Sequence, residues 1–310
     1  MVDGGSVAPP RRTHPLAASR GAARPGGPTR PSVRSADRTV LPATGEDRPL
    51  RRTGREDLRV LSEMASPLQR CAPSRLPEAM DRPDCDARLL RDALDTLARA
   101  NRRFGARRLV LSAVRQILAG REGGPVRILD VGTGSGDIGA HLSRRLAAEG
   151  FRARAVLADL NPRILHLARR RLAEERPRGG RGTLTFVRLT APALPFPDDA
   201  FDVAVSSTML HHLEDVQATG FLGELDRVAS AGWVVTDLRR SRPAYLALRL
   251  LAGTLWRRHP VPRRDGPVSV RRAFTAAEAR GLLDEAGLQG VRVERRFPFR
   301  LRLGRGGGGA

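Results

Sequence analysis

The chain has 310 residues and 40% of them are hydrophobic, so it is long enough to bury a substantial core. Its formal net charge is +22, and every basic residue is arginine. Such a charge is compatible with nucleic-acid binding. The chain is also rich in Ala, Gly and Pro and poor in Ile and Asn, which is typical of codon bias. We favour codon bias and do not expect nucleic acid to be the partner.

Cysteine usage and hydropathy place further limits on the class of protein. Two cysteines, Cys71 and Cys85, are too few for a disulfide framework, and no Cys/His cluster has zinc spacing, so no metal is predicted. The N-terminus lacks the apolar stretch of a signal peptide. No apolar run reaches the roughly 18–20 residues of a membrane span. We expect a soluble, cytoplasmic protein.

The N-terminal quarter has the composition of a disordered segment. Residues 1–75 are rich in Arg, Pro and Gly and follow neither a strand nor a helix period, so they cannot bury enough apolar surface to offset the entropy of ordering. Residues 304–310 form a Gly-rich tail of the same kind. The sequence therefore predicts one folded domain over residues 76–303.

The predicted domain begins with two amphipathic segments and continues as alternating strands and helices. Apolar residues recur at helical spacing over residues 89–98 and 109–118, which predicts a helical N-terminal cover. Five apolar strands follow, and amphipathic helices connect them; the strands are residues 126–131, 155–158, 184–189, 203–206 and 233–236, and the helices are residues 138–148, 163–175 and 217–228. This alternation predicts an α/β fold whose mostly parallel sheet is covered by helices on both faces.

The pattern changes after the fifth predicted strand. Residues 244–256 are apolar nearly all round, so as a helix they must bury both faces, and a basic loop is expected after them. Thr275 and Glu278 form a capping box for a helix that ends at Gly287. The alternation over residues 291–299 predicts the closing strands of the sheet.

A glycine-rich turn joins the first strand to the next helix. Residues 128–137 read Ile-Leu-Asp-Val-Gly-Thr-Gly-Ser-Gly-Asp. Gly132, Gly134 and Gly136 permit positive φ and let a ligand approach the backbone closely. In a dinucleotide-binding G-x-G-x-x-G turn the third glycine comes one residue later than it does here. The spacing therefore argues against a nicotinamide-dependent enzyme.

Two carboxylates flank this turn. Asp130 lies two residues before Gly132, where it would repel a pyrophosphate but suits a ligand with ammonium and sulfonium groups. Asp159 ends the second strand. Its separation along the chain from the glycine-rich turn is close to the offset of about 20 residues at which an acidic residue binds ribose hydroxyls. Together these acids indicate a nucleoside that carries an amino-acid tail and no phosphates.

Residues 76–303 resemble the class I S-adenosylmethionine-dependent methyltransferases. The resemblance rests on residues 129–137, 158–162, 194–202 and 210–213. It implies a Rossmann-like fold with a seven-stranded sheet and S-adenosylmethionine as the cofactor. The turn would hold the methionine end, Asp159 the ribose and Leu160 the adenine. The implied cofactor-binding residues are Asp130, Gly132, Thr133, Gly134, Gly136, Asp159, Leu160, Thr190, Ala191 and Ser207.

One position departs from the pattern of that family. Its members usually carry an Asp after the third strand that reaches the adenine amino group, and this chain has Thr190 there. The Thr190 hydroxyl or the Ala191 backbone would take its place, with weaker binding. Within the family the chain is most similar to small-molecule methyltransferases of bacterial quinone and polyketide pathways. Residues 78–81, 236–241 and 264–274 resemble a subgroup linked with polyketide synthesis.

The residues that would act on the acceptor are expected at the ends of the fourth and fifth strands. His211 and His212 follow the fourth strand, and histidine is the usual base near neutral pH. Asp237 ends the fifth strand and is the third candidate for a catalytic residue. Each also has a structural interpretation. The histidines can cap the next helix or pack beneath the cofactor, and Asp237 can pair with Arg239 or Arg240.

The acceptor class is predicted partly from what the chain lacks. The signature of amino-directed nucleic-acid methyltransferases is replaced by Ser-Ser-Thr-Met at residues 206–209, and one Tyr and two Trp offer little surface for base stacking. The helix over residues 244–256 is either core or a lid over an apolar acceptor, and shallow insertion at a membrane surface is a third interpretation. The candidate acceptor-binding residues are Arg239, Tyr245, Arg264 and Arg271.

The sequence therefore predicts methyl transfer to an oxygen, or to a carbon, of a polyketide, quinone or phenolic lipid. Two alternatives stay open. The first is an RNA or protein methyltransferase, which only the charge favours. The second is a non-catalytic subunit that binds S-adenosylmethionine, which Thr190 and the undecided base favour. The sequence does not indicate the oligomeric state.

Overall fold

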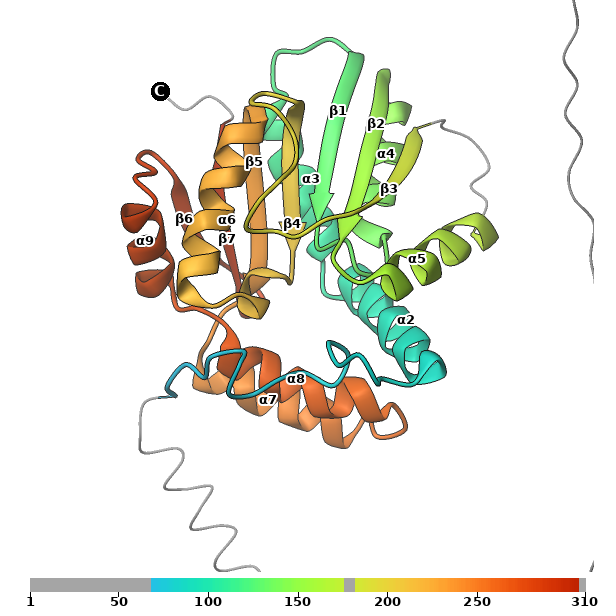
Figure 1. The fold of residues 1–310 in the computed structure, drawn as a ribbon, viewed down its shortest axis with the longest axis vertical. Helices are drawn as coiled ribbons and strands as arrows, with labels where there is room; N and C mark the ends of the chain where they lie inside the picture. The colour runs from blue at the N-terminus through green and yellow to red at the C-terminus, as the bar shows by residue number, and fades with distance from the viewer. Residues whose placement is uncertain (1–67, 176–181, 307–310) are drawn as a thin grey trace, which may run out of the picture. The chain divides into compact units, whose positions relative to one another are not determined.

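The computed structural model describes residues 68–175 and 182–306, whose fold is shown in Figure 1. A seven-stranded sheet forms its centre, in the order β3-β2-β1-β4-β5-β7-β6. Neighbouring strands from β1 to β5 pair in parallel, and β7 runs antiparallel to β5 and β6. The strands are β1 (Gly124–Val131), β2 (Phe151–Asp159), β3 (Thr183–Arg188), β4 (Phe201–Ser207), β5 (Ala229–Leu238), β6 (Arg292–Arg296) and β7 (Arg300–Arg305). The predicted mostly parallel seven-stranded sheet is confirmed.

Strand β1 lies in the middle of the sheet and is apolar on both faces. Ile128 pairs with Ala155 of β2 and with Val203 of β4. Because successive side chains of a strand point to opposite faces, Ile128 and Leu129 belong to different apolar clusters. This is why apolar residues such as Ile128 and Leu129 are adjacent in the strand and do not strictly alternate with polar ones.

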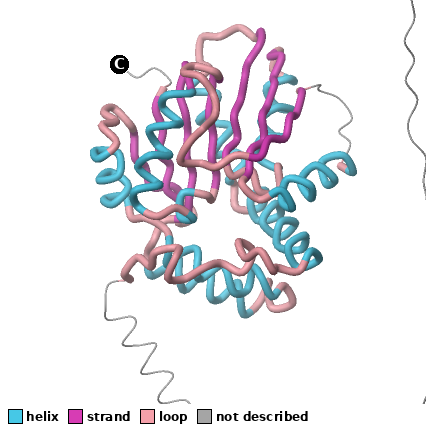
Figure 2. The backbone as a smooth tube through the Cα atoms, in the orientation of Figure 1, coloured by secondary structure: helices cyan, strands magenta, loops and turns pink. Residues whose placement is uncertain are grey.

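Helices cover both faces of the sheet (Figure 2). The apolar clusters pack α3 (Ala106–Ile117) and α4 (Asp137–Ala148) on one face and α6 (Asp215–Val228) and α9 (Ala276–Glu285) on the other. Helix α5 (Pro162–Glu174) follows β2 and packs beside β2 and β3. The predicted capping box is present at α9, where the Glu278 N–H donates to Thr275 Oγ1 at 3.3 Å and the Thr275 N–H donates to Glu278 Oε2 at 2.7 Å.

Helix α2 (Ala87–Arg103) supplies the predicted N-terminal cover. Asp86 caps it, since the backbone N–H groups of Arg88 and Leu89 donate to Asp86 Oδ1 at 2.8 and 3.1 Å. Its apolar face buries Leu90 and Leu94. The helix therefore begins directly after its side-chain cap, where the amphipathic pattern starts.

The folded part begins earlier than predicted. Arg70 Nη2 donates to the Leu213 carbonyl at 2.9 Å, Arg70 also pairs with Asp215, and the Cys71 N–H donates to the Arg271 carbonyl at 2.9 Å. Residues 70 and 71, which precede the expected domain boundary at residue 76, are thus held by polar contacts to distant residues, and such contacts leave no local apolar period in the sequence. The expected disorder of residues 1–67 and 307–310 lies outside the described residues.

Helices α7 (Arg242–Gly253) and α8 (Pro260–Arg272) pack together beyond the carboxyl ends of the parallel strands (Figure 1). The expected basic loop is wrong, because α8 is helical even with Pro267 inside it. Its arginines occupy mostly the outer surface while Asp265 and Ser269 are buried. The expectation that the apolar helix buries both faces is also wrong, since Leu246 and Leu250 of α7 are 42% and 68% exposed.

The C-terminal end of the fold lies beyond its predicted limit. Strand β7 runs to Arg305, which pairs with Trp233 of β5. Gly304 and Arg305 therefore belong to the sheet and not to the tail. Within residues 68–175 and 182–306, no helix is long and apolar enough to cross a membrane.

Candidate active site

A cavity of about 700 Å³ opens at the carboxyl edge of the parallel strands. In open α/β sheets this edge binds ligands where the strand order reverses, which here is between β1 and β4. The cavity extends from the turn after β1 to the short 3-10 helix η1 (Leu210–His212) and to α8. The predicted site residues that line it are Asp130, Gly132, Thr133, Gly134, Asp159, Leu160, Thr190, Ala191, Ser207, His211 and His212.

The glycines of the turn have different functions. A Cβ on Gly132 (φ +69°) would lie 2.3 Å from Met209 Cγ, so this glycine is required by close packing as well as by its backbone angle. A Cβ on Gly136 (φ +72°) would lie 2.8 Å from Leu172 Cδ1, and Gly136 does not line the cavity. The structure thus places Gly136, an expected cofactor-binding residue, at a helix contact behind the site. Gly134 lines the cavity itself.

Asp130 is buried beneath the turn. Its Oδ2 accepts hydrogen bonds from Thr133 Oγ1 at 2.8 Å and from the Gly139 N–H at 3.0 Å. Burial raises the pKa of Asp130 to about 7, although both hydrogen bonds oppose the change. A cationic ligand beside it would favour the ionised form.

Asp159, at the end of β2, accepts a hydrogen bond from the turn after β1. Its Oδ2 accepts from the Gly134 N–H at 3.1 Å and its Oδ1 accepts from the Asn161 N–H at 3.0 Å. Burial raises the pKa of the Asp159 carboxyl above its ordinary value, and these backbone hydrogen bonds lower it. Because a carboxylate has about four acceptor positions, lone pairs are left for a ligand with a pair of hydroxyls.

Small and apolar groups surround the next part of the cavity. Leu160 is 61% exposed at its wall, which is unusual for leucine and offers an apolar surface to a planar ring. Thr190 and Ala191 lie beside it, where Thr190 forms an isolated bridge with Ala193. Ser207 Oγ accepts a hydrogen bond from Thr236 Oγ1 at 3.0 Å.

Asn101 Oδ1 and Arg300 Nη1 are buried polar atoms at the cavity without a hydrogen-bond partner within the described part of the chain. The same is true of His211 Nε2. Asn101 Nδ2 donates to Asp137 Oδ1 at 3.0 Å, which fixes the amide and identifies its oxygen as the free acceptor. Arg300 is 6% exposed, and burial lowers the pKa of its guanidinium despite the charges of Asp237 and Asp137. An unpaired buried acceptor and an unpaired buried donor both suit polar ligand groups.

Neither Asn101 nor Arg300 was predicted from the sequence. Asn101 is a polar residue on the buried side of the amphipathic α2, which was the available signal. Arg300 alternates with Leu301 and shares its face of β7 with Arg302, so no local signal distinguishes it.

His211 is buried between two carboxylates. Its Nδ1 lies 2.7 Å from Asp237 Oδ1, and its Nε2 lies 3.4 Å from Glu78 Oε1. Burial alone would lower the pKa of His211, but Asp237 and Glu78 outweigh it and raise the pKa to about 10. His211 therefore carries a proton at neutral pH in this arrangement, which differs from the expected neutral base. Asp237 does not line the cavity and lies behind His211, so it positions the imidazole and is not placed to touch a ligand.

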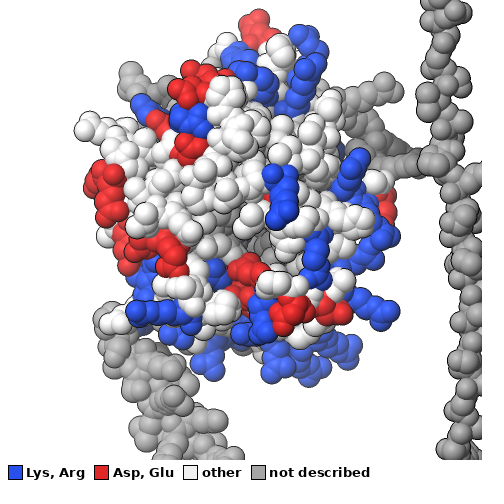
Figure 3. Space-filling model, viewed as in Figure 1, with Lys and Arg blue, Asp and Glu red and all other residues white. Residues whose placement is uncertain are grey.

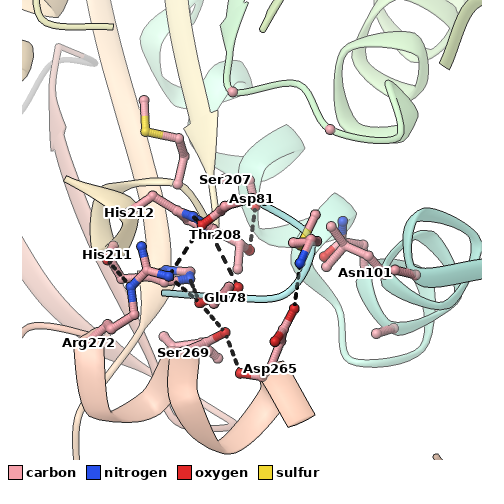
Figure 4. A pocket seen from close by; sticks show the side chains of 18 of the residues that line it. Glu78, Asp81, Asn101, Ser207, Thr208, His211, His212, Asp265, Ser269 and Arg272 are labelled. Carbon is pink, nitrogen blue, oxygen red and sulfur yellow. Dashed lines mark hydrogen bonds and ion pairs between the residues drawn. The ribbon is translucent and has the colours of Figure 1, made fainter. Parts of the chain in front are cut away.

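His212 has a carboxylate partner of its own. Its Nδ1 lies 2.9 Å from Asp81 Oδ2, and Figure 4 shows this cluster from close by. The charges of His212 and Arg272 outweigh burial and lower the pKa of Asp81 to about 2. Arg272 Nη1 lies 3.1 Å from Glu78 Oε1 and 3.3 Å from Asp81 Oδ2. The cluster thus joins the segment before α2, η1 and α8.

The predicted acceptor-binding residues do not line the cavity. Arg264 and Arg271 are exposed on α8, and neither Arg239 nor Tyr245 reaches the cavity. The next residues along the helix, Asp265 and Arg272, face inward instead, because one position changes the direction of a helical side chain by about 100°. The lid still supplies an apolar wall, which consists of Ala247, Leu248, Leu251, Trp256, Val261 and Pro262.

Glu78, Asp81 and Arg272 were not predicted as site residues. The stretch Glu78-Ala79-Met80-Asp81 was noted only for its resemblance to a subgroup, and it reaches the site through contacts with α8. The N–H groups of Ala79 and Met80 donate to the Asp265 carboxylate at 2.8 and 3.1 Å. Such a contact between distant segments leaves no local pattern in the sequence.

Comparisons with known proteins agree with this geometry. A family model described as "Methyltransferase domain" matches residues 128–232. The ubiquinone/menaquinone biosynthesis C-methyltransferase UbiE of Shewanella sp. (strain ANA-3) is 32% identical over 146 residues, which cover 47% of this chain and 54% of that protein. The UbiE protein of Vibrio parahaemolyticus is 38% identical over 117 residues, 38% of this chain and 42% of that protein. The chain spans about half the length of the curated relatives it matches.

A solved structure supports the fold over a longer range. Human N-acetylserotonin methyltransferase, solved with S-adenosylmethionine, aligns with a TM-score of 0.53 at 14% identity, covering 83% of this chain and 68% of that one. The sheet order and the acid-led glycine turn define a Rossmann-like α/β domain. Residues 128–232 match a methyltransferase domain, and the fold around them is that of a methyltransferase.

Proposed function

We propose that this domain transfers the methyl group of S-adenosylmethionine to a ring carbon of a small apolar phenol or quinol. One observation carries the proposal. A single cavity joins the carboxylates of Asp130 and Asp159 to the histidine cluster and to the apolar wall of α7 and α8. Its volume of about 700 Å³ lies within the range of roughly 300–1,000 Å³ that is usual for small-molecule sites.

The nucleoside end of the cofactor fits the residues at β1 and β2. Asp159 has acceptor positions free for the ribose hydroxyls, and Leu160 offers its exposed side chain to the adenine. The Thr190 hydroxyl and the Ala191 backbone lie at the adenine edge in place of the usual Asp. Ser207, at the end of β4, lies on the opposite wall.

The methionine end fits the unpaired polar atoms. Arg300 Nη1 would bind the carboxylate and Asn101 Oδ1 would accept from the ammonium group. Asp130 lies under the same turn and adds the negative charge that favours a cationic ligand. The three residues come from β7, α2 and β1, so the fold brings a donor, an acceptor and an acid to one amino-acid tail.

The acceptor fits the remaining volume. S-adenosylmethionine supplies an electrophilic methyl group, whose bond to sulfur breaks with its electron pair left on sulfur as a neutral thioether. The side chains of α7 and α8 hold the apolar part of the acceptor, and the cluster around Glu78 and His212 meets its hydroxyl and takes up the proton that is released. A phenol that loses this proton is nucleophilic at oxygen and at the ring carbon beside it. When the ring carbon takes the methyl group, its C–H bond breaks and the hydrogen leaves as a proton, which returns to the oxygen and restores the aromatic ring. We assign the carbon because the UbiE relatives are named C-methyltransferases.

The outer face of the lid suits an acceptor that comes from a lipid phase. Leu246, Leu250 and Leu255 are 42%, 68% and 60% exposed. Arginines gather at the lower end of the surface shown in Figure 3, where α7 and α8 lie in Figure 1. Arg249 of α7 and Arg257 in the turn after it are both exposed. Exposed leucines among cations are the pattern of a surface that contacts anionic lipid. Sedimentation with anionic vesicles tests this contact, and Leu250→Asp should abolish it; equal sedimentation of both proteins would contradict it.

A transfer assay tests the proposed reaction. The purified chain is incubated with methyl-labelled S-adenosylmethionine and a panel of alkylated phenols, resorcinols and quinols, and the labelled position is located by NMR. We expect label on a ring carbon of at least one acceptor. Label on a ring oxygen would correct the position, whereas label only in added RNA or protein would contradict the acceptor class.

A further inference from the structure

Three ligand-type side chains from distant parts of the chain converge on one wall of the cavity. Glu78, His211 and His212 each offer one atom, and these atoms lie within 4.8 Å of one another. His211 Nε2 is 3.4 Å from Glu78 Oε1, and His212 Nε2 is 3.8 Å from Glu78 Oε2. Ligand atoms of a tetrahedral zinc ion with bonds of about 2.0–2.1 Å lie about 3.3 Å apart. Arg272 contacts Glu78 Oε1, so the 3.8 Å separation from Glu78 Oε2 is the one that bears on a metal ion. It is somewhat longer than in an occupied tetrahedral site, and the three ligand atoms would draw together around a cation.

Each imidazole is oriented by a carboxylate that contacts its Nδ1 atom. Asp237 Oδ1 lies 2.7 Å from His211 Nδ1, and Asp81 Oδ2 lies 2.9 Å from His212 Nδ1. In each ring the Nε2 atom is thereby directed toward Glu78. A carboxylate on the remote nitrogen is the usual support of a metal-binding histidine. Two such pairs converge on one carboxylate here.

One of these nitrogens lacks a partner. His211 is 1% exposed, and its Nε2 is a buried polar atom without a hydrogen bond among the described residues. An unsatisfied buried nitrogen costs free energy unless a ligand binds it. This atom is aimed at the space between Glu78 and His212.

The charges of the cluster also favour a cation, because the negative charges outnumber the positive ones. Glu78, Asp81 and Asp237 contribute three negative charges, and Arg272 is the guanidinium that contacts the first two. Both imidazoles must be neutral to bind a metal ion, so a cation displaces the proton that His211 otherwise carries, and the remaining charge of the cluster is −2. Glu78 and Asp237 are nearly fully buried, and buried charge of this size is costly unless it is compensated. A divalent cation in place of the proton would compensate it in full.

We propose that Glu78, His211 and His212 form a binding site for a first-row divalent cation such as Zn²⁺, with its open positions facing the cavity. Two histidines and one carboxylate with open positions are a common donor set for catalytic zinc and for non-haem iron. Arg272 holds Glu78 Oε1, which leaves Oε2 for the cation. No metal was predicted from the sequence, because Glu78 is far from the histidines along the chain.

The chemical consequence rests on the proposed function. A cation on this wall would face the hydroxyl of the acceptor and stabilise the oxyanion that forms when the proton leaves. The binding site itself does not depend on that reaction. It can therefore be tested without cofactor or acceptor.

The test is metal binding to the full chain, prepared without an affinity tag and stripped with a chelator. Zn²⁺ is titrated by calorimetry and Co²⁺ by visible absorption. We expect one cation per chain with a dissociation constant below about 1 μM and Co²⁺ bands typical of nitrogen and oxygen ligands. Glu78→Gln and His212→Asn should each weaken binding by about 100-fold or more, and Asp81→Asn, which changes only the support of His212, by about 10-fold.

Two controls make the result specific. His259→Asn removes a histidine that also pairs with a carboxylate, Asp92 at 2.7 Å, but lies outside the cluster, and it should bind like the wild type. Cys71→Ser/Cys85→Ser should also bind like the wild type, which excludes thiolate ligands. No binding by the wild type, or equal binding by Glu78→Gln and His212→Asn, would overturn the site. Either result would leave cofactor binding, measured separately with S-adenosylhomocysteine, as it stands.

Discussion

The Gly134 N–H donates a hydrogen bond to Asp159 Oδ2 across 3.1 Å, which joins the turn after β1 to the end of β2. The same carboxylate accepts from the Asn161 N–H, so its position is fixed by backbone groups of two elements. Its rotamer is therefore set before any ligand arrives. This preorganisation lowers the entropic cost of binding a ribose.

Asp159→Ala should raise the dissociation constant of S-adenosylhomocysteine by roughly tenfold or more, since hydrogen bonds to a charged group are worth about 1.5–3 kcal/mol. Calorimetry measures the change. Asp198→Ala is the matched control, because that carboxylate is 76% exposed in a turn away from the cavity. An affinity that stays equal in the two variants would remove the ribose assignment.

Arg300→Met should separate the two ends of the cofactor. The variant loses the donor assigned to the methionine carboxylate, so its affinity for S-adenosylhomocysteine should fall about tenfold or more. Its affinity for 5′-methylthioadenosine, which has no carboxylate, should stay the same. If both affinities are unchanged and only the KM of the acceptor rises, Arg300 binds the acceptor instead.

Gly132→Ala should destabilise the fold. The added Cβ meets Met209 and the residue is held at φ +69°, where a side chain costs about 1–2 kcal/mol even without a clash. Chemical denaturation should show at least this loss in the free energy of unfolding. Gly223→Ala provides the opposite case, because it lies in α6 with nothing near its Cβ and should stabilise by about 0.5–1 kcal/mol. Equal stability of the two variants would contradict the packing described for Met209.

Asp130 makes stability depend on pH in an unusual direction for an acid. Burial raises its pKa from 3.8 to about 7, so the folded chain holds this proton more tightly than the unfolded chain. The contribution of Asp130 to the free energy of unfolding is therefore most favourable below about pH 4 and is lost as the pH rises to about 7. Relative to Asp130→Asn, the wild type should lose up to about 4 kcal/mol across this window. Parallel unfolding curves of the two proteins from pH 4 to pH 8 would contradict the raised pKa.

The sheet could be predicted from the sequence because it depends on local patterns, and the expected nucleoside half of the site depends on local patterns too. Strand β1, its acid-led glycine turn and Asp159 at the end of β2 all lie within residues 124–159, as a Rossmann-type unit requires. The strands and helices between residues 124 and 238 follow the predicted alternation closely.

The acceptor half was predicted less well because it depends on contacts between distant segments. Glu78 reaches His211 and Arg272 only after the segment before α2 packs against α8. Helix α8 itself was missed because its arginines and prolines resemble a loop in composition, while its inward face is set by the spacing of Asp265, Ser269 and Arg272. The expected acceptor-binding residues Arg264 and Arg271 each lie one helical position before a residue that lines the cavity, Asp265 and Arg272.

Calorimetric titration of the wild-type chain with S-adenosylhomocysteine tests the central claim most directly. The cavity at β1 and β2 predicts a single site that Asp159→Ala weakens and that NADH, with its pyrophosphate, does not fill. Absence of binding at about 1 mM ligand, or displacement by NADH, would contradict the assignment of this cavity to a sulfonium nucleoside.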